Sequence, residues 1–302
     1  MLLGPGGPDG VEVTVLDGLT YAGDLRNLAG LRDDPRLTFV RGDVRDGRTV
    51  EALAARHDEI VHFAAESHVD RANEAGTPFV STNVLGTQVL LEAAVRHGVE
   101  TFVLASTDEV YGTIDSGSST EDAPLSPTSV YSASKAAADH LALAHHRTHG
   151  LDVRISRCCN TYGPRQFPEK IVPLFVTRLL DGLTVPLYGD GGQVREWLHV
   201  DDHCRGVELV RTRGRAGRVY NLGSGVELTN RELTDLLLEA CEAPADRVRH
   251  VADRKGHDAR YSVDWSRARD ELGYTPAVGL REGLAGTVDW YRENPSRRER
   301  RP

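Results

Sequence analysis

Short apolar runs rich in β-branched residues alternate with longer amphipathic stretches in the first half of the chain. The runs predict buried strands at residues 11–16, 37–40, 60–63, 102–106 and 153–156. Between them, residues 78–97 and 131–148 have helical periodicity, and Gly98 and Gly150 stand where glycine commonly ends a helix. Because strands that alternate with helices form βαβ units, the pattern predicts an α/β fold with a Rossmann-like, doubly wound parallel sheet.

The pattern changes after about Tyr162. Short helices, expected at residues 173–180 and 230–240, mix there with glycine-rich turns and short strands. We therefore expect a dinucleotide-binding domain at residues 1–162 and a smaller C-terminal α/β substrate lobe at residues 163–302, interleaved with the first. Residues 296–302 are basic and lack apolar anchors, so we expect a frayed tail.

Composition narrows the class of protein. The chain has 302 residues, 39% hydrophobic and 27% charged, as in ordinary globular proteins. A formal net charge of -9 argues against a general nucleic-acid or anionic membrane surface. No apolar run approaches the roughly 18 residues of a membrane span, and no secretory signal is visible. The four cysteines follow neither metal nor disulfide spacing, so we expect a cytoplasmic protein without a metal site.

The N-terminus contains a glycine pattern, Gly4, Gly7 and Gly10, that resembles a phosphate-binding loop only in its letters. Such a loop follows a strand and opens a helix, whereas here the strand comes after the glycines. Pro5 and Pro8 also remove amide donors. The segment is therefore predicted to be a turn that leads into a strand.

An acidic residue closes each of the first two predicted strands. Asp17 follows the first, where the second strand of a dinucleotide fold carries the acid that binds ribose hydroxyls, and Asp43 suits an adenine contact. The glycine loop normally precedes this acid by roughly 20 residues. We therefore expect the first strand and its glycine loop to be missing from this sequence.

The candidate catalytic groups lie in two segments. Tyr131 and Lys135 are spaced i, i+4, which places them on one helical face, where Lys135 can lower the pKa of the Tyr131 phenol. Thr107, Asp108 and Glu109 follow a buried strand, and doubly wound folds place their chemistry at the carboxyl ends of strands. These groups predict a base at Tyr131, a hydroxyl at Thr107 that can hydrogen-bond the reacting hydroxyl, and an acid and a base with separated pKa values at Asp108 and Glu109.

At this point the chain resembles a known family, the nucleotide-sugar 4,6-dehydratases of the extended short-chain dehydrogenase/reductase type, and in particular the dTDP-glucose 4,6-dehydratases. The resemblance extends from about residue 11 to residue 291. It rests on these segments, in order: VLDGLTYAG, VRGDVRD, HFAAESHVDR, TNVLGTQ, STDEVYG, YSASK, RCCNTYGP, FPEKIVPLF, PLYGDG, VREWLHVDDH, NLGSGVELTN and RKGHDARY.

The resemblance implies an NAD-dependent lyase that dehydrates dTDP-glucose to dTDP-4-keto-6-deoxyglucose for deoxysugar biosynthesis. Tyr131 would deprotonate the C4 hydroxyl while hydride passes to NAD, Glu109 would remove the C5 proton, and Asp108 would protonate the departing C6 hydroxyl. Hydride then returns to C6. The family also forms homodimers through its two long helices, here at residues 78–97 and 131–148.

The resemblance also implies two sets of binding residues. The NAD contacts would be Asp17, Leu19, Thr20, Asp43, Val44, Ala64, Ala65, Ser67, Thr82, Tyr131, Lys135 and Cys158. The nucleotide-sugar contacts would be Asn160, Glu169, Lys170, Pro186, Tyr188, Arg195, Asn230, Arg254 and His257. Arg195 and Arg254 suit a diphosphate, because guanidinium binds phosphate oxygens bidentately.

Two alternatives stay open. A related epimerase or decarboxylase would share NAD, Tyr131 and Lys135, although it needs no acid to expel water from C6. A non-catalytic nucleotide-sugar-binding protein would follow if the N-terminal loss is genuine. Four positions depart from the family pattern, namely Gly18, Ala72, Thr161 and Arg165. Thr161 and Arg165 lie near the expected sugar and diphosphate, so they bear on which substrate is accepted.

Overall fold

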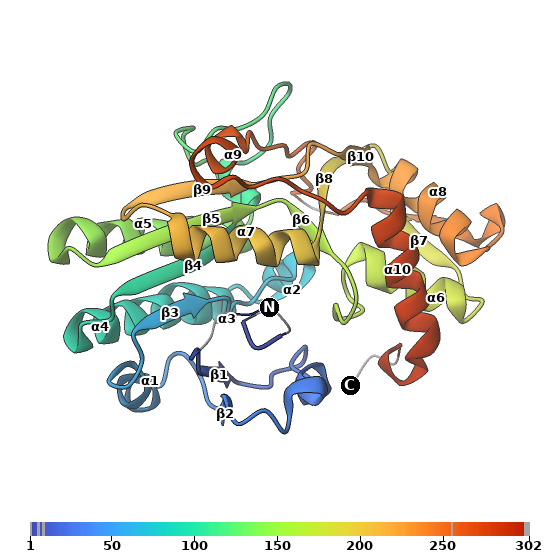
Figure 1. Cartoon of the computed structure of the whole chain (residues 1–302). Helices are drawn as coiled ribbons and strands as arrows, with labels where there is room; N and C mark the ends of the chain where they lie inside the picture. Colours follow the sequence, from blue (N-terminus) through green and yellow to red (C-terminus); the bar gives the residue numbers. More distant parts are fainter. Residues whose placement is uncertain (1, 5–6, 8–9, 255, 299–302) are drawn as a thin grey trace.

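The structure is a computed structural model that describes residues 2–4, 7, 10–254 and 256–298 (Figure 1). Its first half contains β1 (Val13–Asp17), the 3-10 helix η1 (Leu25–Leu31), β2 (Leu37–Arg41), α1 (Gly47–Ala54), β3 (Glu59–His62), α2 (Val69–Glu74), α3 (Thr77–Phe79), the π-helical η2 (Val80–Gly86), α4 (Thr87–His97), β4 (Thr101–Thr107), the 3-10 helix η3 (Asp108–Tyr111), α5 (Val130–His149) and β5 (Asp152–Cys158).

The second half is built from shorter elements. These are β6 (Asn160–Tyr162), α6 (Ile171–Leu180), β7 (Val185–Tyr188), β8 (Val194–His199), α7 (Val200–Arg213), β9 (Arg218–Leu222), β10 (Glu227–Thr229), α8 (Asn230–Cys241), the 3-10 helix η4 (Ala245–Arg247), β11 (Val248–Val251), α9 (Ser266–Leu272), α10 (Leu280–Glu293) and the 3-10 helix η5 (Pro295–Arg297).

Parallel strands form the centre of the first lobe, which confirms the predicted α/β class. Strands β3, β4, β5 and β9 are hydrogen-bonded in that order, and all their pairings are parallel. Strands β1 and β2 form a separate parallel pair. The single continuous sheet that the pattern predicted is thus two sheets within the described residues. Because β9 comes from the second half of the chain, the two lobes interleave.

The expectation that a first strand is missing is not supported. The first strand of the described chain is β1, which runs from Val13 to Asp17 and pairs in register with β2, Val13 opposite Leu37 and Asp17 opposite Arg41. Three consecutive β-branched residues, Val13, Thr14 and Val15, favour the extended conformation of this segment. Ahead of it, the amide of Gly7 donates to the carbonyl of Gly4 at 2.9 Å, a turn as predicted. Pro5 and Pro8 lie outside the described residues.

Helices cover both faces of the four-stranded sheet (Figure 1). On one face, α1, α4 and α5 enclose an apolar cluster that includes Leu91, Phe102 and Ile155. On the other, α7 and α9 enclose a second cluster around Val103, and its members Cys158 and Cys159 are buried free thiols. The residues of β4 alternate between these clusters, as the period-two geometry of a strand requires.

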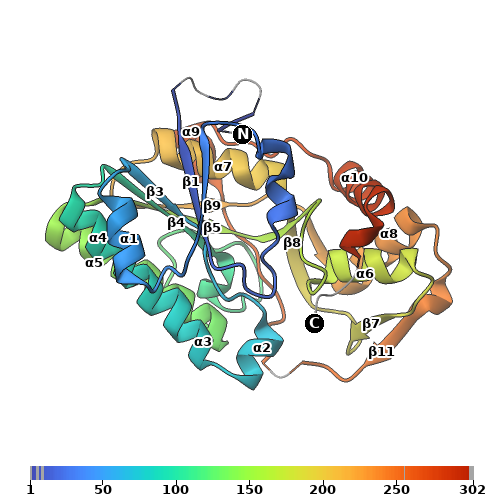
Figure 2. The same ribbon diagram turned by 90° about the horizontal axis from the view of Figure 1, so that it is seen from below.

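The second lobe has its own apolar cluster, centred on Phe175, Trp197 and Leu237. It is formed mainly by α6, α8 and α10, which pack beside β7 and β8 (Figure 2). Strands β10, β8 and β6 form a mixed sheet, and β11 pairs with β7 in parallel. The lobe is therefore a small α/β unit that stands beside the ends of β4 and β5.

Both long helices end where the sequence predicted. Gly98 and Gly150 have φ angles of 68° and 72°, a left-handed conformation that glycine adopts without steric cost. The first helix is not uniform, because η2 interrupts its α-helical hydrogen bonds between α3 and α4. Within η2 the buried amide of Asn83 bonds the backbone of Glu66 and the hydroxyl of Ser134. A tertiary contact therefore accompanies the wider turn.

The expectation of a frayed tail is wrong for residues 296–298. Arg297 donates to the Asp24 carboxylate at 2.7 Å and to Asn27 at 2.9 Å, and Arg298 contacts Asp181 at 3.1 Å. Specific ion pairs thus replace the apolar anchors that the segment lacks. Residues 299–302 lie outside the described part of the chain.

Candidate active site

The predicted catalytic groups converge at the carboxyl ends of β4 and β5. Thr107 and Cys158 are register partners at these ends. The chain turns after Thr107 into η3, so Asp108 and Glu109 follow directly. Helix α5 begins beside them with a capping box between Ser129 and Ser132, which fixes where its first turn lies. Tyr131 lies in that turn, close enough to Glu109 for the two groups to interact electrostatically.

Asp108 and Glu109 differ in their environments. Asp108 is 3% exposed, and burial followed by the nearby Glu109 charge raises its pKa well above the usual range. Its Oδ1 accepts a hydrogen bond from Thr107 at 3.2 Å, while its buried Oδ2 has no partner within the described residues. Burial also raises the pKa of Glu109, but Lys170 and Arg195 oppose that shift. Asp108 is thus held protonated, and Glu109 is closer to ionisation.

Tyr131 and Lys135 occupy the same face of α5. Burial raises the pKa of the Tyr131 phenol, the Glu109 carboxylate raises it further, and a hydrogen bond from Thr107 lowers it. Burial lowers the pKa of Lys135 to about 8, and its Nζ donates to the Ala105 carbonyl at 2.7 Å. The expected lowering of the phenol pKa by Lys135 is therefore outweighed by burial in the chain without cofactor.

A pocket of about 800 Å³ opens beside these groups and is lined by both lobes. This volume suits a large small-molecule ligand. The pocket brings together most of the predicted catalytic and nucleotide-sugar residues, namely Thr107, Asp108, Glu109, Tyr131, Cys158, Asn160, Glu169, Lys170, Pro186, Tyr188, Arg195, Asn230, Arg254 and His257, together with Ser67.

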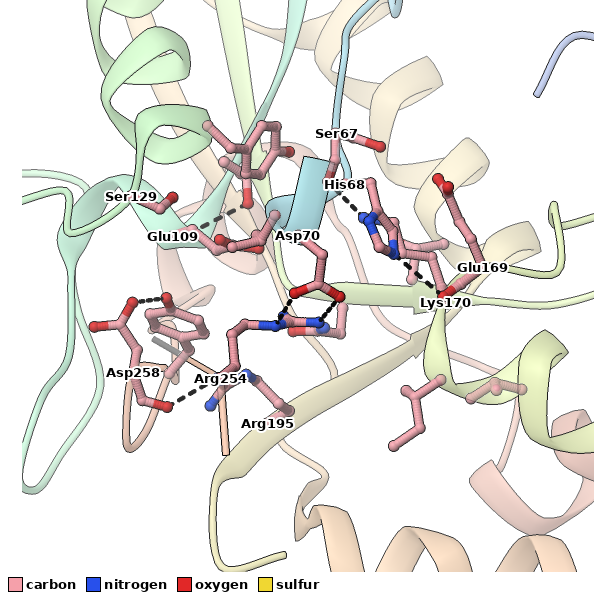
Figure 3. Close-up of a pocket in the computed structure, with 18 of the residues that line it drawn as sticks. Ser67, His68, Asp70, Glu109, Ser129, Glu169, Lys170, Arg195, Arg254 and Asp258 are labelled. Carbon is pink, nitrogen blue, oxygen red and sulfur yellow. Dashed lines mark hydrogen bonds and ion pairs between the residues drawn. The ribbon is translucent and has the colours of Figure 1, made fainter. Parts of the chain in front are cut away.

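The polar residues of the second lobe are held by bonds around this pocket (Figure 3). Lys170 Nζ donates to the Ser67 carbonyl at 2.5 Å, so it reaches across to the first lobe. Arg195 Nη2 donates to the Asp258 carbonyl at 2.9 Å, and its guanidinium lies 4.4 Å from the Tyr261 ring centroid. His257 Nδ1 lies 2.8 Å from Asp253 Oδ1, although burial lowers the pKa of this imidazole. The Lys170 ammonium and the Arg195 guanidinium therefore face a common cavity.

The remaining predicted cofactor residues lie outside the pocket lining. Those at or just after the ends of β1, β2 and β3 are Asp17, Leu19, Thr20, Asp43, Val44, Ala64 and Ala65, whereas Thr82 lies in η2 and Lys135 in α5. Asp17 Oδ1 accepts the amide of Leu19 at 2.6 Å, and Leu19 has a φ of 48°, which is strained for leucine. Asp43 is held by Arg45 at 2.9 Å, which lowers the pKa of that carboxyl.

These residues fit a dinucleotide. Asp17 ends β1 and Asp43 follows the neighbouring parallel strand β2, and the buried Lys135 ammonium and the buried Ser106 hydroxyl, which has no partner among the described residues, lie further along the same edge. Ribose hydroxyls donate to carboxylates and accept from ammonium groups, so the donor set matches the ligand. Strain at Leu19 is also of the kind that gathers at binding sites.

Thr161 and Arg165, two of the positions that depart from the family pattern, lie in different surroundings. Thr161 lines the pocket, and its Oγ1 lies 3.2 Å from Cys158 Sγ and 3.4 Å from His203 Nδ1. Arg165 has a φ of 69° and donates to the Asn27 carbonyl at 3.4 Å, beside a second, smaller cavity. Thr161 can therefore contact a ligand in the main pocket, whereas Arg165 is directed elsewhere.

Sequence reasoning did not single out several residues that line the pocket. They are His68, Asp70, Arg71, Ser129, His203, Asp258 and Tyr261. Most of them lie inside segments that had carried the resemblance, HFAAESHVDR, VREWLHVDDH and RKGHDARY. The signal was therefore present, but only the folded chain identifies their partners.

Two other features are defined by the described residues. No group of three or more metal-ligating side chains is found among them. In the same part of the chain, every helix is too short or too polar to cross a membrane.

Known proteins resemble this chain along most of its length. The family described as GDP-mannose 4,6 dehydratase matches residues 7–287. A dTDP-glucose 4,6-dehydratase from Streptomyces antibioticus is 65% identical over 282 residues, 93% of this chain and 83% of the relative. The crystal structure of DesIV, a dTDP-glucose 4,6-dehydratase from Streptomyces venezuelae with NAD bound, superposes with a TM-score of 0.93 at 61% identity, covering 94% of this chain and 88% of DesIV. A UDP-glucose 4-epimerase from Thermotoga maritima gives a TM-score of 0.88 at 30% identity, covering 95% and 93%.

Proposed function

The chain belongs to the GDP-mannose 4,6-dehydratase family, and we propose from this membership and from its site that it dehydrates dTDP-glucose to dTDP-4-keto-6-deoxyglucose with NAD as cofactor. It is a hydro-lyase, and its reaction is redox-neutral overall. The observation that carries the proposal is the pair of adjacent carboxyl groups, Asp108 and Glu109, beside Tyr131 at the end of β4. Elimination of water needs an acid and a base together, and this pair supplies both.

NAD, when bound, supplies the acceptor for the C4 hydride of the sugar and the donor that returns hydride to C6. We propose that Asp17, Leu19, Thr20, Asp43, Val44, Ala64, Ala65, Ser67, Thr82, Lys135 and Cys158 hold it. The buried Lys135 ammonium lies on the face of α5 that Tyr131 shares, where it can bind a ribose hydroxyl. Together these residues would hold the cofactor.

The residues of the site then move three protons. Tyr131, reacting as the phenolate, accepts the proton of the C4 hydroxyl as C4 is oxidised to a ketone. The ketone acidifies the C5 hydrogen, which Glu109 removes as a proton. Asp108 gives its own proton to the C6 hydroxyl, so that the C6–O bond breaks and water leaves. Glu109 finally returns its proton to C5 while C6 accepts hydride.

One proton must still be redistributed before the next cycle, since Tyr131 has gained a proton and Asp108 has lost one. Thr107 hydrogen-bonds both groups, and its Oγ1 lies 3.2 Å from Asp108 Oδ1. The Thr107 hydroxyl therefore connects the proton acceptor of the first step to the proton donor of the third.

We assign the nucleotide-sugar to the second lobe, residues 163–302, and the cofactor to residues 1–162. Asn160 at the junction, Glu169, Lys170, Pro186, Tyr188, Arg195, Asn230, Arg254 and His257 line the pocket from this side. Arg195 and Arg254 supply the positive charge that a diphosphate requires. The pocket thus divides into a reactive end at Glu109 and an anion-binding end at Arg254.

We also propose that two copies of the chain associate through η2, α4 and α5. Val80 and Leu85 on η2 are 51% and 52% exposed, and Val130 at the start of α5 is 39% exposed. Exposed apolar side chains grouped on neighbouring helices favour a protein contact. Leu85→Asp should then shift the mass measured by light scattering from dimer to monomer. The four free thiols favour the cytoplasm as the compartment.

An epimerase or decarboxylase shares the cofactor edge and Tyr131, but not the need for Asp108. A non-catalytic binding protein would need neither Asp108 nor Glu109 in this arrangement. The buried, protonated Asp108 is costly for the fold, so its retention favours dehydration over both alternatives.

The proposal is tested by incubating the purified protein, of verified intact mass, with dTDP-glucose and NAD. We expect a product lighter than the substrate by one water, with no net accumulation of NADH. An isomer of unchanged mass would instead indicate epimerisation, and loss of carbon dioxide from a uronic-acid substrate would indicate decarboxylation. Binding of dTDP-glucose without turnover would favour the non-catalytic alternative.

A further inference from the structure

Asp70 lies in the pocket without a role in the reaction described above. It is the second residue of α2, three residues after Ser67 in the segment that we assign to the cofactor. Its carboxylate faces Arg254 from the other lobe. Arg254 Nε lies 2.6 Å from Asp70 Oδ1, and Nη2 donates to Oδ2 at 2.9 Å (Figure 3). Two guanidinium nitrogens thus lie against the two carboxylate oxygens, one through a hydrogen bond and one through a close ion-pair contact, and charge-assisted contacts of this kind fix the position of a guanidinium.

The same carboxylate also holds Tyr188. The Tyr188 hydroxyl donates to Asp70 Oδ2 at 3.3 Å, and the Arg254 guanidinium lies 5.1 Å from the centroid of the Tyr188 ring. Tyr188 ends β7, and Arg254 follows β11, the strand that pairs with β7. One side chain of the first lobe thus binds two neighbouring side chains of the second.

The next residue of α2 makes a similar contact with the opposite charge. Arg71 Nε lies 3.5 Å from Glu169 Oε2, and its guanidinium stands 3.7 Å over the ring of Tyr21. Glu169 precedes Lys170, which itself reaches the Ser67 carbonyl. Helix α2 and the loop before it therefore meet the second lobe on both sides of the pocket.

A carboxylate is electrostatically unfavourable beside a site for a diphosphate, since like charges repel. Its presence needs a compensating gain, and the geometry offers one. An arginine side chain loses rotamer freedom when it is fixed, and this loss weakens binding unless it is met before the ligand arrives. Asp70 fixes Arg254 before the ligand arrives, and it uses Nε and Nη2, which leaves the Nη1 edge of the planar group for a phosphate oxygen.

We propose that Asp70 is a positioning residue for nucleotide-sugar binding: it holds Arg254 and Tyr188 in the orientation that receives the diphosphate, and it couples this wall of the pocket to the cofactor-lining loop. The inference rests on the proposed function for the identity of the ligand. The opposite role, a latch in which Asp70 competes with the diphosphate for Arg254, predicts the opposite sign of effect and is distinguished by experiment.

The test is Asp70→Asn in the full chain, with the Kd for dTDP measured by calorimetry and KM and kcat measured for dTDP-glucose. We expect Kd and KM to rise about ten-fold, equivalent to about 1.4 kcal/mol, with kcat changed less than about two-fold. Asp70→Glu, which keeps the charge, should restore most of the affinity. An unchanged or tighter Kd for dTDP in Asp70→Asn would overturn the proposal, and a tighter Kd would establish the latch instead.

Glu59→Gln is a matched control. Glu59 is paired to Arg211 at 2.6 Å, with side chains 36% and 16% exposed, against 35% and 22% for Asp70 and Arg254. Neither control residue lines the pocket. Glu59→Gln should leave Kd and KM unchanged. An equal effect in Glu59→Gln and Asp70→Asn would show that general destabilisation is responsible and would overturn the proposal.

A double-mutant cycle makes the test independent of folding defects in one variant. In an Arg254→Ala background, Asp70→Asn should have little further effect on the Kd for dTDP, because its partner is already absent. Additive effects would contradict positioning through Arg254. If the wild-type chain binds dTDP but does not dehydrate dTDP-glucose, the proposed function fails while the Kd measurements still decide the role of Asp70.

Discussion

Thr107 hydrogen-bonds the phenol of Tyr131 and so joins the carboxyl end of β4 to the first turn of α5. This bond lowers the pKa of a phenol that burial and the Glu109 carboxylate raise. The same hydroxyl lies 3.2 Å from the protonated Asp108. Thr107 is therefore central to the proton movements of the site in a way that no other hydroxyl of the pocket matches.

Thr107→Val should lower kcat by about a hundred-fold, the usual size of an effect on acid–base catalysis, with a smaller change in KM. Valine keeps the β-branched shape in the strand but removes the hydrogen bonds to Asp108 and Tyr131, together with the one that Thr107 accepts from the Glu109 amide at 3.3 Å. Thr107→Ser should recover most of the rate. Steady-state kinetics on dTDP-glucose measures both, and Thr148→Val is the control, because Thr148 bonds only within its own helix at Ala144. A fully active Thr107→Val protein would remove Thr107 from the mechanism.

Glu109→Gln should stop exchange of the C5 hydrogen with solvent, because the amide cannot remove a proton. Oxidation at C4 should persist, so enzyme-bound NADH should accumulate and be seen by its absorbance. Incubation in D2O, followed by mass analysis of recovered sugar, measures the exchange directly. Normal turnover in this variant would refute the role of Glu109, and loss of cofactor binding would point to a structural effect.

Asp108→Asn should abolish dehydration and at the same time stabilise the protein at neutral pH. The folded pKa of Asp108 is raised well above 3.8, so its contribution to stability is fully present below the unfolded pKa and is lost as pH rises toward the folded pKa. Asparagine does not titrate. The Tm advantage of the variant, measured by calorimetry, should therefore grow as the pH rises above about 4, the ordinary pKa of an aspartate. A constant difference across this range would show that Asp108 is ionised when buried.

Much of the fold was predictable because local signals agree with the global structure. The buried strand β4 appears as a continuous apolar run at residues 102–105, and the long helices stop at Gly98 and Gly150. The π-helical η2 was not predictable, since its Asn83 bonds residues 17 and 51 positions away. For the same reason the sequence could not show that the basic segment at Arg297 is anchored on Asp24.

The residues of the site also divide into those that the sequence could place together and those that it could not. Glu109 and Tyr131 could be placed together because the carboxyl ends of parallel strands and the starts of the following helices meet at one edge. Asp70 could not, because its partner Arg254 is 184 positions away, and only the closure of the two lobes makes that pair. Sequence patterns fix which edge is functional, whereas contacts between lobes fix how its charges are arranged.

Asp139 and Arg157 form a buried ion pair. Arg157 Nε donates to Asp139 Oδ2 at 2.8 Å, with the two side chains 4% and 0% exposed. Arg157 Nη1 also donates to the Tyr111 hydroxyl at 2.9 Å, and Tyr111 donates to Asn221 at 2.7 Å. Tyr111 belongs to η3, the helix that carries Asp108 and Glu109. The network therefore supports η3, the segment that carries Asp108 and Glu109.

Asp139→Asn should lower the free energy of unfolding by about 3–5 kcal/mol, because it leaves the Arg157 charge buried without its partner. The Asp139 charge also opposes the burial that lowers the pKa of Lys135 to about 8, so the variant should lower that pKa further. Urea denaturation measures the first effect, and the alkaline limb of the pH–rate profile, shifted to lower pH, measures the second. Asp270→Asn, which breaks the exposed pair with Arg269, should change neither. A variant with wild-type stability would show that the Arg157 charge is compensated without Asp139, and an unshifted limb would separate Asp139 from the titration of Lys135.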